Sequence, residues 1–218
     1  MSRLLPLFPL KSVLFPGTPI QLQIFEPRYK EMLRVCMAHD HSFGVVLIKH
    51  GSEAFGPMPE PYLVGCRAVV REVQSLPEGR SRLFALGHER FRITSIAQAE
   101  PYLVGCVEYD ALNDNPDPGV GSVAANVAGR MLRYTDILSE SGRDIVDLSN
   151  LPADPYSLAY RICSVLQIPL TEKQSLLEMD SLVHLFRMLE RILERELALM
   201  PAMLAEGPLD GIGPFGWN

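Results

Sequence analysis

The spacing of hydrophobic and polar residues changes once along the chain, close to residue 112. Before that point, Ile20–Ile24 alternates apolar and polar residues, which is typical of a half-buried strand. The apolar stretches 4–10, 43–48 and 61–109 are also predicted to form strands. The prolines in the first of these suit a sheet edge or a strand start, because proline lacks the N–H that a ladder needs.

One helix is predicted between these strands. Glu26 precedes Pro27, and proline suits the first position of a helix. Four apolar residues then follow at helical spacing: Tyr29, Met32, Leu33 and Cys36. Their shared face predicts that Cys36 is a core residue rather than a nucleophile.

Two glycine-containing segments predict changes of direction within 61–109. Leu76-Pro-Glu-Gly79 has the composition of a hairpin turn. Gly87 divides two strand-like stretches and predicts a bulge, a positive φ or a close approach of another strand.

A seven-residue sequence occurs twice in this half. Glu-Pro-Tyr-Leu-Val-Gly-Cys occupies 60–66 and again 100–106, but the residues between the copies do not continue the identity. We interpret the copies as two strands of one barrel with a shared strand-start sequence. A tandem repeat, or a site that pairs Cys66 with Cys106, is the alternative.

The second half has helical periodicity. Apolar residues over 124–138 keep helical spacing, and Asp154-Pro155 predicts an N-cap followed by a first-turn proline. Thr171–Gln174 fits a capping box, and Asp180 is predicted to cap a last helix that ends at Pro201. We therefore divide the chain into a β-barrel subdomain (1–112), a helical bundle (113–205) and a Gly/Pro-rich tail (206–218).

The composition and the distribution of charge limit the partners and the location that we expect for the protein. The chain has 218 residues, 47% of them hydrophobic, and a net charge of −6. Residues 1–112 contain 12 Lys and Arg against 11 Asp and Glu, whereas residues 113–218 contain 8 against 15. This acidic second half argues against a nucleic-acid partner. Four dispersed cysteines and the absence of a signal peptide or a long apolar run predict a cytoplasmic protein with free thiols and no membrane contact.

Motifs for chemistry are missing. The sequence has no Gly-Lys dipeptide, and therefore no phosphate-binding loop of the Walker type. It also has no Gly-x-Ser-x-Gly and no His-Glu-x-x-His. The cluster His39-Asp40-His41 is predicted to be a solvated loop. We therefore expect no enzymatic activity, no metal and no cofactor.

Several ordered motifs resemble one family. Leu5–Leu10, Leu14–Gly17 and Leu22–Tyr29 are similar to the opening of the Lon protease N-terminal domain, including its stand-alone bacterial form. The segment 76–93, with Leu-Pro-Glu-Gly and Gly-x-x-Arg-Phe-Arg-Ile, and Leu170–Glu178 resemble later parts of that domain. The resemblance covers roughly residues 3–200.

This resemblance implies an α+β fold, in which a PUA-like β pseudo-barrel with one helix precedes a C-terminal helical bundle. It also implies recognition of protein substrates, since the ATPase and peptidase of Lon have no counterpart before Asn218. The expected partners are unfolded or tagged client proteins, and a protease is a further expected partner. An RNA-binding PUA-like module and a hydrolase with an unrecognised site are the alternatives.

Candidate protein-binding residues come from two segments, one at the start of the predicted helix and one on a predicted strand. In Glu26-Pro-Arg-Tyr29 we expect Glu26 to cap the helix, Tyr29 to pack in the core and Arg28 to be a solvated ion-pair partner, and the alternative is that Arg28 lines a peptide groove. Arg90 and Arg92 share one face of a predicted strand, which is either solvated or contacts acidic clients.

The tail supplies one more candidate. Trp217 is the only tryptophan of the chain and lies in a segment too rich in glycine for a helix. A frayed terminus is the first interpretation. The alternative is a strip that docks through its aromatic residues on the chain's own barrel or on a neighbouring subunit.

Overall fold

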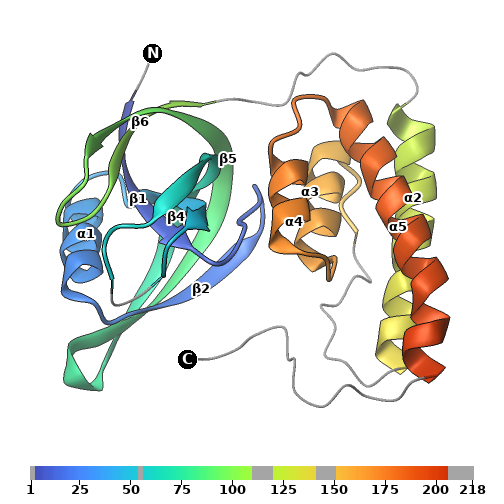
Figure 1. The fold of residues 1–218 in the computed structure, drawn as a ribbon, viewed down its shortest axis with the longest axis horizontal. Coiled ribbons are helices and arrows are strands. Elements are labelled where there is room, and N and C mark those ends of the chain that lie inside the picture. Colours follow the sequence, from blue (N-terminus) through green and yellow to red (C-terminus); the bar gives the residue numbers. More distant parts are fainter. Residues whose placement is uncertain (1–2, 54–55, 110–119, 141–150, 206–218) are drawn as a thin grey trace. The chain divides into compact units, whose positions relative to one another are not determined.

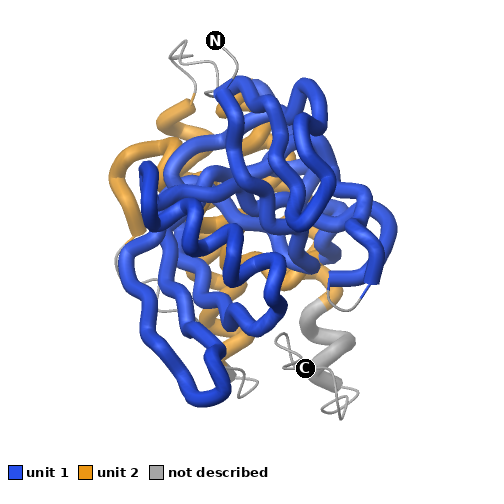
Figure 2. The backbone as a smooth tube through the Cα atoms, turned by 90° about the vertical axis from the view of Figure 1, so that its left-hand side faces the viewer, with its two compact units in different colours: residues 1–112, 169–180 blue, residues 113–168, 181–218 orange. Residues whose placement is uncertain are grey.

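The computed structural model describes residues 3–53, 56–109, 120–140 and 151–205 (Figure 1). The chain forms two compact units, which Figure 2 distinguishes by colour. The sheet unit consists of 1–112 and 169–180, and the helical unit consists of 113–168 and 181–218. The predicted tail at 206–218 lies outside the described residues. No helix in the described part of the chain is long and apolar enough to cross a membrane.

The sheet unit holds six strands in the order β2-β5-β4-β3-β1-β6, and a further pairing between β5 and β6 closes five of them into a ring. Only β1 and β3 run parallel to each other. The strand bounds are β1 Arg3–Leu10, β2 Pro19–Ile24, β3 Ser42–His50, β4 Glu60–Leu76, β5 Arg80–Gln98 and β6 Val104–Tyr109.

Two local features give this sheet its shape. The predicted hairpin turn is a short 3-10 turn, η1 (Pro77–Gly79), and Glu78 and Gly79 both adopt positive φ there. Gly87 lies at a register shift between β4 and β5, with its backbone bonded to Gly17 and Thr18. Its φ is not in the positive range; a Cβ at this position would overlap the carbonyl oxygen of Phe15. The close approach is therefore confirmed, and a positive φ is wrong.

The core of the sheet unit lies inside the ring and beneath helix α1 (Pro27–Ala38). Tyr29, Met32, Leu33 and Cys36 are all buried, as their spacing predicts. Phe91 is fully buried inside the ring, and Gly44 makes room for it, since a Cβ at that position would lie 2.6 Å from the ring. The predicted core position of Cys36 is confirmed.

The two copies of the seven-residue sequence have different structures. Glu60–Cys66 lies wholly within β4, whereas in the second copy only Val104–Cys106 belongs to a strand, and the Glu100–Pro101 peptide bond is cis. Strands β4 and β6 are not neighbours in the sheet. The first copy begins β4 and the second leads into β6 of the same ring, so the expectation of two strands of one barrel is confirmed, whereas Cys66 and Cys106 lie on strands that do not pair.

The helical unit contains α2 (Val120–Glu140), α3 (Pro155–Val165) and α5 (Leu182–Ala205), and each of these helices contacts the other two. Asp154 caps α3 as predicted, because its carboxylate accepts a hydrogen bond from the Ser157 N–H at 2.8 Å. The expected end of the last helix at Pro201 is wrong, since α5 continues to Ala205. A proline removes one intrahelical hydrogen bond, and here the helix tolerates that loss.

Helix α4 (Leu170–Leu177) corrects the expected domain division, because it belongs to the sheet unit. The helix begins one residue before Thr171, so no capping box forms, and the side chain of Gln174 is buried instead. Its Nε2 donates to the carbonyl oxygen of Val64 in β4 at 3.0 Å and to Glu178 at 2.8 Å. The bond to Val64 attaches α4 to the sheet, whereas the bond to Glu178 joins Gln174 to the C-cap residue of the same helix.

Candidate functional site

The first candidate group lies where β2 gives way to α1. Glu26 is the N-cap residue, but its carboxylate makes no capping bond and instead pairs with Arg28 at 2.8 Å. Arg28 also donates to the carbonyl oxygen of Gly56 at 3.3 Å, and its guanidinium lies 4.8 Å from the centre of the Tyr29 ring. The side chains of Arg28 and Glu26 are only 14% and 12% exposed.

These contacts bear on the expectations for Glu26, Arg28 and Tyr29. Glu26 is the N-cap residue as expected, but its carboxylate makes no capping bond, because the neighbouring guanidinium pairs with it. A solvated Arg28 is wrong, because this side chain links the helix start to Gly56. Tyr29 is a core residue as predicted: its ring stacks on Phe8, and burial raises the pKa of its hydroxyl to about 12.

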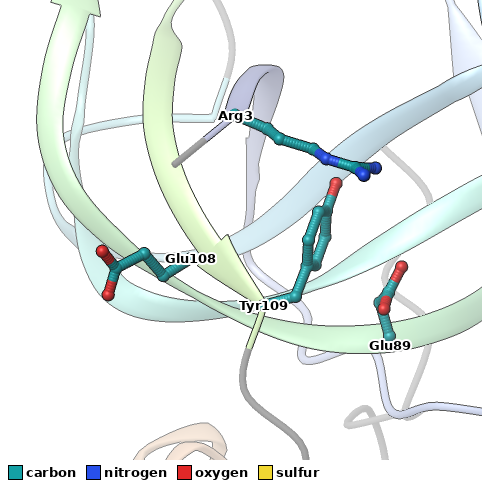
Figure 3. A pocket seen from close by; sticks show the side chains of 4 residues that line it. All are labelled: Arg3, Glu89, Glu108 and Tyr109. Carbon is teal, nitrogen blue, oxygen red and sulfur yellow. The ribbon is translucent and has the colours of Figure 1, made fainter. Parts of the chain in front are cut away.

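A second group lies where β6 closes the ring against β1 and β5. Arg3, Glu89, Glu108 and Tyr109 line a hollow of about 530 Å³, named here the Arg3–Tyr109 hollow (Figure 3). In Figure 3 the side chains of Arg3 and Tyr109 point toward each other, and Glu108 extends away from them. The Arg3 guanidinium is 5.9 Å from the centre of the Tyr109 ring.

Arg67 from β4 supports this hollow. Its guanidinium lies 5.6 Å from the Tyr109 ring centre, pairs with Glu89 at 2.8 Å and is 3.1 Å from Nδ1 of His88. Burial raises the pKa of Tyr109, and the positive charge of Arg67 opposes part of that rise. The result is a tyrosine ring with the guanidinium groups of Arg3 and Arg67 near it, beside the carboxylates of Glu89 and Glu108.

Arg90 and Arg92 have different environments. Arg90 is 3% exposed, and its guanidinium donates to the carbonyl oxygen of Leu177 and to Asp180, each at 3.0 Å, and to the carbonyl oxygen of Met179. The expectation of a solvated Arg90 is therefore wrong, and so is the expectation that Asp180 caps α5. Ser181 receives the first bonds of α5 instead, from the backbone of His184 and Leu185.

Arg92 is exposed, as expected. It stands opposite Glu108 in the pairing of β5 with β6, beside the Arg3–Tyr109 hollow. The structure thus places Arg92 close to this hollow. Glu26, Arg28 and Tyr29 contact one another at a different place, the start of α1. Trp217 lies outside the described residues.

Most of the hollow was not foreseen from the sequence. Arg3, Glu89 and the pair Glu108 and Tyr109 come from three strands that are distant in the chain, and the pairing of β6 with both β1 and β5 brings them together. The sequence feature that came closest to indicating this hollow is the occurrence of charged and aromatic residues near both ends of residues 1–112.

Two of the described cysteines are buried deeply enough for their thiol pKa to be raised. Burial raises the pKa of the Cys36 thiol to about 12 and raises that of Cys66 as well, which keeps both thiols protonated at neutral pH. Within the described ranges, no three His, Cys, Asp or Glu residues are grouped so as to hold a metal ion.

Comparison with known proteins gives the family. The family model described as the ATP-dependent protease La (LON) substrate-binding domain matches residues 4–195. The chain belongs to this family. Among curated relatives, Lon protease 1 of Herpetosiphon aurantiacus is 27% identical over 201 residues, which is 90% of this chain and 24% of that protein. Lon protease 2 of Myxococcus xanthus is 24% identical over 204 residues, which is 92% of this chain and 24% of that protein.

Solved structures agree with this membership in the LON family. A crystal structure of a Lon N-terminal domain protein from Xanthomonas campestris is 27% identical, with a TM-score of 0.60, and the match covers 94% of this chain and 99% of that one. The N-terminal domain of Mycobacterium avium complex Lon protease gives a TM-score of 0.66 at 16% identity, over 88% of this chain and 98% of that one, and shows the fold alone. The chain thus spans about a quarter of the length of the curated relatives and nearly all of these solved chains.

Proposed function

We propose that this LON-family chain binds segments of client proteins and performs no chemistry on them. The observation that carries the proposal is the match of residues 4–195 to a substrate-binding domain. The matched region is about a quarter of the Lon protease relatives, and they owe their names to an activity of the whole protein. The matched region alone supports a role in substrate recognition, or a role as an adaptor that passes clients to a protease.

The site supports binding rather than catalysis. The buried thiols of Cys36 and Cys66 are held protonated, and Glu26 and Glu89 are each paired with an arginine, so neither carboxylate is poised as an isolated base. At the Arg3–Tyr109 hollow the guanidinium of Arg3 lies near the Tyr109 ring, and that of Arg67, paired with Glu89, lies near the same ring. We infer that Arg92 and this hollow contact acidic parts of clients.

The proposal also covers the type of fold, the clients and the location of the protein. The ring of five strands with β2 attached is in keeping with a PUA-like pseudo-barrel. Unfolded or tagged proteins are the proposed clients, and the cytoplasm is the proposed location. Arg90 has no place in the proposed contact surface, since its guanidinium is buried against the end of α4.

The test compares one protein in two states. Fluorescently labelled α-lactalbumin is titrated with this chain, once reduced and carboxymethylated so that it stays unfolded, and once native. Saturable binding of the unfolded form alone supports the proposal. Equal binding of both forms, or of neither, contradicts it, and ATP hydrolysis or peptide cleavage that co-purifies with the chain contradicts its non-catalytic part.

A further inference from the structure

Strand β2 has one side that is open along its whole length. The ring is closed by the pairing of β5 with β6, whereas β2 pairs with β5 only. A strand of this kind presents a row of unpaired N–H and C=O groups, to which another extended chain can bond.

The register shows which residues of β2 face the open side. The N–H of Gly87 in β5 donates to the carbonyl oxygen of Thr18 at 2.9 Å, and the pairing continues from Pro19 opposite Leu86. In an antiparallel pair, successive residues direct their backbone groups alternately toward the partner strand and away from it. The residues that bond to β5 are therefore Ile20, Leu22 and Ile24.

Pro19, Gln21 and Gln23 direct their backbone groups to the open side. Proline agrees with this position, because its missing N–H is not needed by β5. No described residue makes a hydrogen bond to the backbone of Gln21 or Gln23 on that side. Both glutamines are exposed.

The usual protections of a sheet edge are sparse here. Natural edges are blunted by lysines, bulges or a covering segment. The pairing of Pro19–Ile24 with β5 runs without a register shift, and apart from Pro19 the outward positions carry neutral glutamines. Two complete N–H and C=O pairs, at Gln21 and Gln23, are available to an incoming strand.

The surroundings indicate what such a strand would carry. Ile20 and Leu22 pack against the core but remain partly exposed, so apolar side chains on the same face of an added strand would cover them. On the other face, Arg82 of β5 stands opposite Gln23 and is exposed; it donates a long hydrogen bond to Oε1 of Gln74 at 3.5 Å and forms no ion pair with a described residue. A carboxylate on the added strand beside Gln23 would lie about two strand spacings, ~10 Å, from the Arg82 backbone, within reach of its long side chain.

We propose that the open side of β2 binds an extended segment of an unfolded protein as an additional antiparallel strand. Apolar residues of that segment cover Ile20 and Leu22, and an acidic residue meets Arg82. A second copy of this chain fits less well, because its β2 has no carboxylate to offer Arg82. The inference rests on the proposed function and adds the surface and the chemistry of the client.

Amide hydrogen exchange tests this inference on the unaltered protein, with the reduced, carboxymethylated α-lactalbumin as probe. At saturation the amides of Gln21 and Gln23 exchange at least tenfold more slowly, while those of Ile20 and Leu22, already bonded to β5, change little. This alternation is specific to strand addition. Unchanged exchange at Gln21 and Gln23 under saturating probe overturns the inference and leaves the proposed function intact, whereas absence of probe binding overturns both.

A variant pair adds an independent test. Gln21→Pro removes an outward N–H that β5 does not use, and Gln21→Ala keeps it. We expect Gln21→Pro to bind the probe about tenfold more weakly than Gln21→Ala at similar melting temperature, because a ladder bond is lost and the ring projects toward the added strand. Equal affinity of two folded variants overturns the inference. Protection of Gln21 that rises with protein concentration in the absence of probe assigns the edge to a second copy and also overturns it.

Discussion

Replacement of Arg90 by alanine should release the α4 segment from the sheet. The guanidinium is 3% exposed and is the donor to the carbonyl oxygens of Leu177 and Met179 at the end of α4. A cation at this position also opposes the partial negative charge of a helix C-terminus. The alanine variant leaves these carbonyl groups without their donor and a void where the side chain was.

The expected loss of stability in Arg90→Ala follows from the hydrogen bonds that Arg90 makes. Hydrogen bonds from a charged donor contribute about 1.5–3 kcal/mol each, so the two carbonyl groups account for about 3–6 kcal/mol. The ion pair with Asp180 adds little, since that carboxylate side chain is 68% exposed and solvent screens it. The loss is thus a large part of the ~5–15 kcal/mol that stabilises a typical domain.

Hydrogen exchange in α4 and urea unfolding measure this effect. We expect the amides at the end of α4 to exchange about 10²–10³-fold faster in Arg90→Ala, which corresponds to about 3–4 kcal/mol. Arg92→Ala is the matched control on the same strand, because Arg92 is exposed, and it should change stability by less than about 0.5 kcal/mol. Equal exchange in the two variants would refute the attachment of α4 through Arg90.

Three further predictions concern single sites. Gly87→Ala should cost more than ~2 kcal/mol in urea unfolding, because its Cβ would overlap a backbone carbonyl oxygen, whereas Gly129→Ala has open space and should be neutral or stabilising by up to ~1 kcal/mol. The pKa of Cys36 is raised to about 12, so unfolding free energy should fall by up to ~1.4 kcal/mol per pH unit as pH rises from about 9 toward 12, and Cys36→Ala should lack that part of the slope. A double-mutant cycle of Glu26→Gln with Arg28→Ala should give a coupling of about 1–3 kcal/mol in thermal or urea unfolding, since both side chains are mostly buried, and additive effects would show that the pair contributes nothing.

Local sequence patterns correctly predicted those elements that depend on residues close together in the chain. The alternation in β2, the single apolar face of α1 and the Asp154 cap of α3 all arise from short-range chemistry, and the structure contains each of them. The hairpin at 77–79 was equally readable, since Pro and Gly have restricted roles in turns.

Long-range contacts decided the rest. The same seven residues form a strand at 60–66 and mostly irregular structure at 100–106, because their neighbours in the fold differ. Arg90 and Arg92 have the same residue type and the same position in the alternation, yet only Arg90 lies under the end of α4, 87 residues away in sequence from its acceptor at Leu177. No periodicity within a strand could distinguish these two arginines.

The candidate site was partly predictable for a similar reason. Glu26, Arg28 and Tyr29 are consecutive or nearly so, and their mutual contacts follow from the start of a helix. The Arg3–Tyr109 hollow and the open side of β2 depend on which strand closes the ring and which is left outside it. Strand order is a property of the whole sheet and cannot be read from any one segment.

The most direct test of the proposed function is the titration of labelled α-lactalbumin with this chain at constant ionic strength. Binding to protein segments predicts a saturable rise in anisotropy for the reduced, carboxymethylated form and no rise for the native form. Competition by excess unlabelled unfolded protein should reverse the rise, and competition by single-stranded RNA should not. Absence of binding to the unfolded form, or displacement by RNA alone, would contradict a role in recognising protein clients.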